Sequence, residues 1–299
     1  MRPTTKLRQL LRGPGIIVAP GAYDCFTAKL IEREGFPAVY MTGAGTALTR
    51  LGQPDLGFAT LNEMVSNAAA IAATVSVPLI ADADTGYGGS LNVYRTVREY
   101  ERAGVAALHL EDQVFPKRCG HLDGKQVIST EEMVIKLRAA VEARMDENFV
   151  LIARTDALAV TGLDDTLRRC QAYAEAGADV LFVEAVRTRE EIERVVREVN
   201  VPLLYNFVEH GKSPLLPVAE LQRLGFKMVI FPGSIMLAVV PLVHEILGAI
   251  KRHGTTEALL GRMTNVVELF ETMGLSALLA FDARVAGGAT VPHVMDARS

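Results

Sequence analysis

The stretch that decides the fold is VPLIADADTGYGG (77–89), in which a short apolar run ends in Asp82 and Asp84 and passes into a glycine-rich turn. Runs of this kind, rich in Val, Ile and Leu with little polar alternation, are typical of parallel strands that are covered on both faces. We expect eight such strands, over residues 16–19, 38–41, 79–82, 106–110, 150–154, 180–184, 203–206 and 228–231.

Amphipathic stretches of helical spacing lie between these runs, and a glycine such as Gly104 or Gly225 often stands between helix and strand. Eight strand and helix units in one chain of this length predict an α/β fold, a (β/α)₈ TIM barrel. A doubly wound open sheet is the alternative, but no GxGxxG turn follows the first strand. We expect one domain over 1–299, with 255–299 as a C-terminal helical extension that frays after the small-residue stretch 286–290.

Charge, cysteine count and the length of the apolar runs exclude several classes of protein. The 299 residues carry a net charge of −4, which argues against a nucleic-acid partner, and 49% of them are hydrophobic, which excludes wholesale disorder. Three scattered cysteines form no disulfide framework, and the first residues lack the apolar core of a signal peptide, so we expect a cytoplasmic protein. The apolar runs 228–232 and 235–243 are shorter than a membrane span, so no membrane partner is expected.

Polar residues gather where the predicted strands end, which is the end of a barrel that carries chemistry. They are Thr42, Gly43, Asp82, Asp84, Glu111, Asp112, Arg154, Asp156, Glu184 and Asn206. Two oxygen ligands such as Asp82 and Asp84 suit Mg²⁺, and Glu111 could hold a metal-bound water. The alternative is that Asp84 only caps the following turn.

A second cluster is EDQVFPKRCGH (111–121), where Cys119 stands among Lys117, Arg118 and His121. Neighbouring cations would lower the pKa of the thiol, so we expect Cys119 to transfer a proton near neutral pH. The local sequence does not separate a nucleophile from a proton donor. Cys25 and Cys170, by contrast, are expected to be inert core residues.

Two residues of the strands themselves have alternative interpretations. His109 lies within a predicted strand and is expected to be a satisfied core histidine. Tyr40 ends another strand and is either a packing residue or reaches the site, because it precedes the turn at 42–45.

The sequence resembles the isocitrate lyase and phosphoenolpyruvate mutase superfamily over nearly its whole length. The motifs that carry the resemblance are YMTGAG (40–45), GQPDLG (52–57), ADADTGYGG (81–89), HLEDQ (109–113), KRCGH (117–121), ARTDAL (153–158), VEA (183–185) and NFVEHGKSP (206–214). KRCGH beside the DADTG turn is most similar to the short-chain lyase branch with 2-methylisocitrate lyase and 2,3-dimethylmalate lyase, because phosphonate mutases and oxaloacetate decarboxylases lack this cysteine.

The resemblance implies a lyase that cleaves a carbon–carbon bond of a small 2-hydroxy dicarboxylate with Mg²⁺, or Mn²⁺ in its place. It also implies a homotetramer, as a dimer of dimers, whose C-terminal helices are exchanged between subunits. By resemblance, Asp82 and Asp84 bind the metal, with Glu111 acting through water. Thr42, Gly43 and Ala44, together with Asp82, bind the 2-oxo acid half.

The remaining roles concern the reacting bond. Arg154, Glu184 and Asn206 line the site, and Cys119 is the proton donor, with Gly120 and His121 supporting its mobile loop. Lys117 and His121 complete the catalytic set, and Tyr40 is the candidate base for the substrate hydroxyl.

Departures from the branch bear on the substrate. Methylisocitrate lyases carry Thr where this chain has Val208, and Arg where it has Leu237 and, less securely aligned, Val266; KRCGH is followed by LDGK rather than RPNK. An unpaired carboxylate is costly in an apolar pocket, so we expect 2,3-dimethylmalate, cleaved to pyruvate and propionate. The alternatives are 2-methylisocitrate, giving pyruvate and succinate, then oxaloacetate decarboxylation, and, in a different class, a non-catalytic binding barrel.

Overall fold

The computed structural model describes residues 1–286 and forms a closed barrel of eight parallel strands in sequence order. The strands are β1 (Ile17–Ala22), β2 (Val39–Met41), β3 (Leu79–Asp82), β4 (Ala107–Glu111), β5 (Val150–Thr155), β6 (Val180–Val183), β7 (Leu203–Asn206) and β8 (Met228–Phe231). Pairing of β1 with β8, in which Ile17 lies opposite Met228, closes the barrel. The (β/α)₈ prediction is confirmed, and the open-sheet alternative is wrong.

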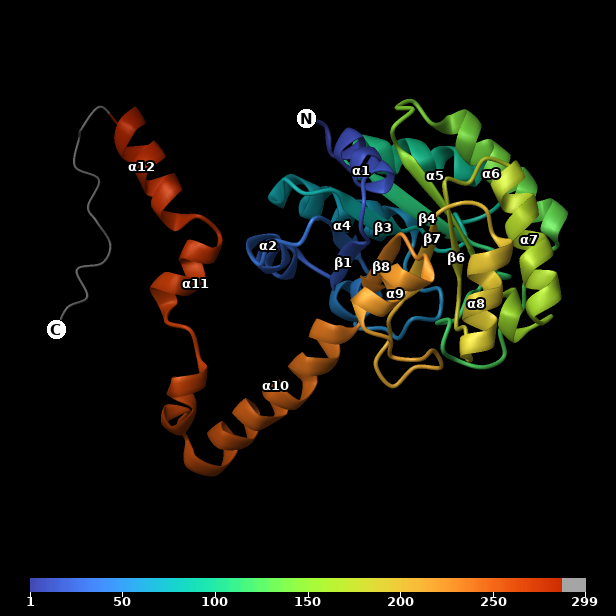
Figure 1. The fold of residues 1–299 in the computed structure, drawn as a ribbon. Coiled ribbons are helices and arrows are strands. Elements are labelled where there is room, and N and C mark those ends of the chain that lie inside the picture. The colour runs from blue at the N-terminus through green and yellow to red at the C-terminus, as the bar shows by residue number, and fades with distance from the viewer. Residues whose placement is uncertain (287–299) are drawn as a thin grey trace. The chain divides into compact units, whose positions relative to one another are not determined.

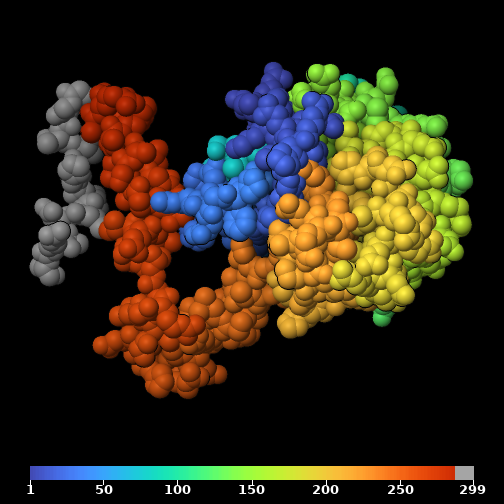
Figure 2. Space-filling model, in the orientation of Figure 1, coloured from blue at the N-terminus to red at the C-terminus, as the bar shows by residue number. Residues whose placement is uncertain are grey.

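Helices follow the strands and surround the barrel (Figure 1). They are α2 (Cys25–Arg33), α3 (Gly43–Thr46), a π-helical turn (Ala47–Leu51), α4 (Leu61–Thr74), α5 (Ser90–Arg102), α6 (Thr130–Ala143), a 3₁₀ turn (Ala157–Ala159), α7 (Leu163–Glu175), α8 (Arg189–Glu198) and α9 (Val218–Leu224). After β8 the chain continues into α10 (Ser234–His253). Gly225 ends α9 with a φ of 113°, a conformation that glycine adopts without steric cost. On the face seen in the space-filling view, the atoms of residues 1–233 form one closely packed body (Figure 2).

Side chains alternate along each strand between the barrel interior and the layer under the helices. In β5, Val150 and Ile152 belong to the interior core, whereas Leu151 and Ala153 pack in the outer layer. With a period of two, Arg154 continues the interior row at the C-terminal end of the strand. The same alternation sends the polar residues at the strand ends toward the barrel axis, where they meet.

The opposite end of the barrel is covered by α1 (Pro3–Arg12). Leu7 is fully buried against the interior core. Arg8 pairs with Asp179 at 2.7 Å and donates to the carbonyl of Asn148 at 3.1 Å, just before β6 and β5 begin. Because this end is sealed, the C-terminal end of the strands is the one that is free to carry a site.

The chain divides into two compact units, Met1–Val240 and a second that begins at Pro241. The second contains the rest of α10, a 3₁₀ segment (Glu257–Arg262), α11 (Val266–Thr272) and α12 (Leu275–Val285), so the prediction of extra C-terminal helices is confirmed. The predicted frayed end lies outside the described residues beyond 286.

Helix α10 bears on the membrane prediction. An 18-residue window of this 20-residue helix has a mean hydropathy of 1.6, so the helix is long and apolar enough by length and composition to cross a membrane. The uninterrupted apolar run at 235–243 covers only the first half of this helix, so the run length underestimates it. Length and composition alone are weak evidence, because helices of soluble proteins pass the same test.

Candidate active site

Strands β2 and β3 place the first group of predicted residues at the C-terminal end of the barrel. The Tyr40 hydroxyl lies 2.8 Å from His109 Nε2, and Asp82 Oδ1 lies 3.6 Å from the same nitrogen. Thr42 caps the short helix α3 by accepting from the Gly45 N–H at 3.3 Å. A Cβ at Gly43 would overlap the Asp82 carboxylate, so the Thr42–Gly43 backbone lies directly against that group.

A buried acidic pair with one lysine occupies the turn after β3. Asp82 Oδ1 accepts from the Asp84 backbone N–H at 2.9 Å, and Asp84 Oδ1 lies 2.7 Å from Lys117 Nζ. Lys117 also donates to Asp55 at 2.5 Å. Burial raises the pKa of Asp82, and burial together with Asp82 and Asp55 raises that of Asp84 to about 6, against the opposing effect of Lys117.

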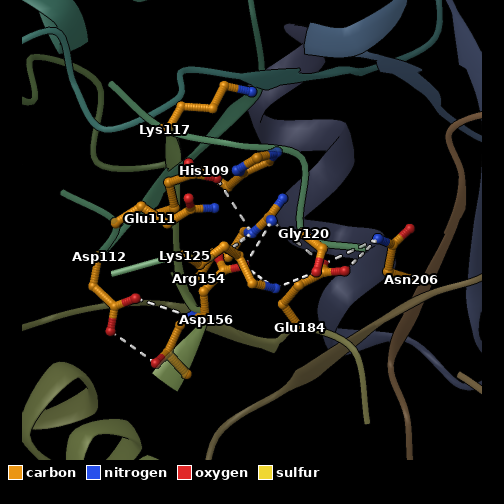
Figure 3. Close-up of polar contacts among 12 residues, drawn as sticks. His109, Glu111, Asp112, Lys117, Gly120, Lys125, Arg154, Asp156, Glu184 and Asn206 are labelled. Atoms are coloured by element: carbon orange, nitrogen blue, oxygen red, sulfur yellow. Dashed lines mark hydrogen bonds and ion pairs between the residues drawn. The ribbon is translucent and has the colours of Figure 1, made fainter. Parts of the chain in front are cut away.

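Strands β4 to β7 contribute a second charged group centred on Arg154 (Figure 3). Arg154 donates to Asp156 with two nitrogens at 2.9 and 3.2 Å and lies 3.3 Å from Glu111 Oε2 and 3.7 Å from Glu184 Oε2. Asn206 donates to Glu184 at 3.0 Å. Although burial alone would raise it, Arg154 and His121 lower the pKa of Glu184 to about 2.

The segment with Cys119 lies against this second group. A Cβ at Gly120 would come within 2.5 Å of both Arg154 NH2 and Glu184 Cγ. The Lys212 backbone N–H donates to His121 Nδ1 at 3.0 Å, so the ring proton lies on Nε2, 2.9 Å from Glu184 Oε1. The close approach requires glycine at position 120 and brings Cys119 to the mouth of the barrel.

The prediction of a lowered thiol pKa at Cys119 is wrong. Burial raises the pKa of Cys119, against the opposing hydrogen bond from the His121 backbone. The expected cations are engaged elsewhere: Lys117 pairs with Asp55 and Asp84, and the Arg118 guanidinium donates to the Asp123 carbonyl. A thiol that stays protonated suits a proton donor better than a nucleophile.

The carboxylates outnumber the cations in this site. The buried or nearly buried acids are Asp55, Asp82, Asp84, Glu111, Asp156 and Glu184, and the cations are Lys117, Lys125 and Arg154. Glu111 Oε1 is buried without a hydrogen-bond partner, and burial raises the Glu111 pKa well above its usual range. Within residues 1–286 no three His, Cys, Asp or Glu side chains form a ready metal site. Two carboxylates with waters nevertheless fit Mg²⁺, and a divalent cation would compensate the excess charge.

Sequence reasoning missed several residues of the site. His109 lies in the barrel interior beside Asp82 with its Nδ1 unpartnered, and burial lowers its pKa to about 3. Lys125 lies 3.2 Å from Asp156, a residue predicted at a strand end, and both side chains are buried; Asp55 contacts Lys117. The signals lay in the sequence, as Asp55 in GQPDLG and Lys125 in LDGK, but nothing local indicated their partners.

Comparison with known proteins shows the family of the chain. The sequence model of the family described as phosphoenolpyruvate phosphomutase matches residues 7–251. The chain is 45% identical to 2,3-dimethylmalate lyase of Eubacterium barkeri over 288 residues, 96% of this chain and 100% of that protein. It is also 45% identical to 2-methylisocitrate lyase of Aeropyrum pernix over 285 residues, 95% of this chain and 91% of that protein.

Solved structures agree. A crystal structure of 2,3-dimethylmalate lyase superposes with a TM-score of 0.93 at 44% identity, covering 99% of both chains. Oxaloacetate acetylhydrolase with 3,3-difluorooxalacetate gives 0.92 at 43%, covering 97% of this chain and 100% of the other. Phosphonopyruvate hydrolase with oxalate and Mg²⁺ gives 0.87 at 33%, covering 96% and 100%. The chain therefore belongs to the phosphoenolpyruvate phosphomutase family, as a carbon–carbon lyase of the isocitrate lyase and phosphoenolpyruvate mutase superfamily.

Proposed function

We propose that this enzyme is a Mg²⁺-dependent lyase that cleaves a 2-hydroxy-2-methyl dicarboxylate, best 2,3-dimethylmalate, to pyruvate and propionate. The observation that carries the proposal is the contact of Gly120 with Arg154 and Glu184. Cys119 directly precedes Gly120, and burial keeps its thiol protonated beside buried carboxylates and the fixed guanidinium of Arg154.

Asp82 and Asp84 would hold the metal directly and Glu111 through water, with Mn²⁺ as a possible substitute. Bound there, a divalent cation would acidify the substrate's 2-hydroxyl and stabilise negative charge on its oxygens. A relative at 33% identity was crystallised with oxalate and Mg²⁺, which supports the choice of Mg²⁺ as the metal. Lys117, which now pairs with Asp84, would keep the acidic pair oriented.

Proton movements fall to the chain's own residues. The 2-hydroxyl proton passes to the Tyr40 oxygen as Tyr40 gives its own phenolic proton to His109 Nε2, 2.8 Å away. Burial raises the Tyr40 pKa, so the side chain is a phenol before and after this transfer. The C2–C3 bond breaks and its electron pair passes to C3, as the enolate of a carboxylate. Arg154 stabilises that charge. The Cys119 thiol then donates its proton to C3, which completes propionate.

Binding of the other half falls to Thr42, Gly43 and Ala44, whose backbone begins α3 beside Asp82 and would hold the pyruvate carboxylate. Glu184 and Asn206 position Arg154 and His121 at the reacting end. His121 in turn orients the backbone that follows Cys119.

The choice of a methyl side group on the substrate rests on two apolar residues of the first unit. Val208 lies in the segment after β7, and Leu237 in the first turn of α10; the two segments are joined by a hydrogen bond between Ser234 and Glu209. Neither side chain can pair with an extra carboxylate, which favours a methyl group there. Val266 belongs to the second unit, so the proposal rests on the other two positions.

Two alternatives remain, cleavage of 2-methylisocitrate and chemistry on oxaloacetate. A 2-methylisocitrate lyase and an oxaloacetate acetylhydrolase are both similar to this chain, at 45% and 43% identity. The deciding experiment measures pyruvate release from 2,3-dimethylmalate and 2-methylisocitrate under identical conditions. We expect the first to have the higher kcat/KM, and faster cleavage of 2-methylisocitrate would overturn the choice. Oxaloacetate decarboxylation does not need Cys119, so Cys119→Ser should leave that activity intact but remove most of a lyase activity. A wild-type enzyme that does not cleave 2,3-dimethylmalate, with decarboxylation that survives Cys119→Ser, would favour the decarboxylase.

The assembly is proposed to be a cytoplasmic homotetramer, a dimer of dimers with exchanged C-terminal helices. In the second unit many large apolar side chains are exposed, including Leu247, Leu260, Phe270, Leu278 and Phe281. Exposed apolar surface of this extent is typical of a subunit interface. Sedimentation of the full chain would show a tetramer, and a monomer at micromolar concentration would contradict this assembly.

A further inference from the structure

We propose that Lys125 is a positioning residue that latches the Cys119 loop, residues 119–124, onto the barrel through Asp156. The inference rests on the proposed role of Cys119 in the reaction. It concerns a residue that touches neither the reacting bond nor the metal ligands, and that acts through the backbone beside the thiol.

The geometry of Lys125 is that of a bridge. Its ammonium donates to the Gly120 carbonyl, which directly follows Cys119, and lies 3.2 Å from Asp156 Oδ1 (Figure 3). Only 2% of the Lys125 side chain and none of the Asp156 side chain is exposed. A buried ammonium is retained only when it is paired and hydrogen-bonded, and these two partners meet that requirement.

Asp156 is itself fixed by the barrel. Its backbone N–H donates to Asp112 Oδ1 at 2.9 Å, and its carboxylate accepts both hydrogen bonds from Arg154. One carboxylate therefore sets the position of the guanidinium and, through Lys125, that of the Gly120 carbonyl. The Asp156 carboxylate therefore positions both the loop that carries the proton donor and the guanidinium that stabilises the enolate.

Other contacts also hold this loop, among them those of His121 with Glu184 at 2.9 Å and with the Lys212 backbone N–H at 3.0 Å. Gln113 fixes its entry by two hydrogen bonds with the Arg118 backbone, at 2.8 and 3.0 Å. The outer side borders a cavity of about 610 Å³ that Lys117, Arg118, Gly124 and Lys125 help to line. At the tip, the pair of Lys212 with Asp123 is exposed, and such pairs contribute little. The Lys125 bridge thus adds a fully buried polar contact at the exit of the loop to the nearly buried pair of His121 with Glu184.

The test compares Lys125→Met with Asp123→Asn, a control that removes the exposed ion pair of the same loop. The purified enzyme with Mg²⁺ is treated with iodoacetamide, and alkylation of Cys119, Cys25 and Cys170 is followed separately by peptide mass spectrometry. Release of the loop exposes the thiol, and each unit by which its pKa then falls multiplies the thiolate fraction about tenfold. We expect Lys125→Met to raise the Cys119 rate about tenfold or more and Asp123→Asn to change it less than about twofold.

A merely structural role would leave Cys119 as protected as before, or expose all three cysteines together. Cys170 is fully buried and reports on unfolding. If Cys170 is also alkylated in Lys125→Met, that variant is unfolding, and Lys125→Gln, which keeps a hydrogen-bond donor, is tested instead. Faster alkylation of Cys119 with Cys170 still protected is again the expected result. Wild-type protection of Cys119 in a folded variant would overturn the proposal. The alkylation assay uses no substrate, so its result does not depend on whether the proposed reaction is correct. In assays of activity, kcat of Lys125→Met should fall more than KM rises.

Discussion

Adding one methyl group at Gly120 tests whether the loop of Cys119 must approach the barrel as closely as it does. In Gly120→Ala the new Cβ would meet Arg154 NH2 and Glu184 Cγ at 2.5 Å and Glu184 Cδ at 2.6 Å. Neither neighbour can yield readily, because Asp156 holds Arg154 with two hydrogen bonds, and Asn206 and His121 hold Glu184. The loop must therefore retreat rather than the barrel.

The size of the effect follows from that retreat. Ordinary contact of a Cβ begins at 3.4 Å, so the loop moves by roughly 1 Å, and a misplacement of about 1 Å can cost about 100-fold in rate. This corresponds to about 2.7 kcal/mol of transition-state stabilisation. The barrel core is untouched, so the thermal midpoint should change little.

The assay is pyruvate release from the preferred substrate, with kcat and KM determined for wild type, Gly120→Ala and Gly89→Ala. Gly89 is the matched control, because it lies at the same end of the barrel with φ −81° and no heavy atom within 4 Å of an added Cβ. We expect kcat/KM of Gly120→Ala to fall about 100-fold and that of Gly89→Ala to change less than about twofold. A folded Gly120→Ala variant within about threefold of wild type would refute the steric reasoning.

Three further predictions follow from charges and pKa values. Burial raises the Cys119 pKa above its usual value of 9.0, and the thiol must be protonated to act as the donor. We therefore expect kcat to persist to about pH 9 and to fall only at higher pH. A decline of kcat between about pH 7 and 8 in the pH–rate profile would contradict this. Although burial opposes it, hydrogen bonds from Lys29 and Ser76 lower the Glu32 pKa from 4.5 to about 2, so its contribution, up to about 3 kcal/mol, is present above pH 4.5 and is lost as pH falls toward 2. Glu32→Gln should lower the free energy of unfolding at pH 7 and flatten its fall in acid, and equal acid dependence in both proteins would argue against this. Leu237→Arg should raise the preference for 2-methylisocitrate over 2,3-dimethylmalate by about 10- to 100-fold, since a hydrogen bond to a charged group contributes about 1.5–3 kcal/mol; an unchanged ratio of kcat/KM values would show that this position does not contact the side group.

The barrel could be predicted because its signal is local and repeated. Each of the eight predicted strands is present, and 79–82, 203–206 and 228–231 have the observed bounds. Fully buried parallel strands leave continuous apolar runs, and the polar residue that ends such a run points to the barrel axis by the period of two. That is why Asp82, Glu111, Arg154 and Asn206 could be placed at one site without coordinates.

What the sequence could not predict were pairings across the barrel. The cations near Cys119 in the chain suggested a lowered thiol pKa, but Lys117 and Arg118 have partners elsewhere, and burial prevails. His109 could not be distinguished from a packing residue, because its proximity to Asp82 depends on the register of β3 and β4. The buried pair of Lys125 with Asp156 joins positions 31 residues apart that no local pattern relates.

The central claim is that a divalent cation on Asp82 and Asp84 is required for cleavage of a carbon–carbon bond to give pyruvate. The most direct measurement is pyruvate release from 2,3-dimethylmalate before metal removal, after complete removal with EDTA, and after Mg²⁺ is restored. Our account predicts loss of activity on removal and its recovery on restoration, with one propionate formed for each pyruvate. Pyruvate release that persists in the metal-free enzyme would contradict it.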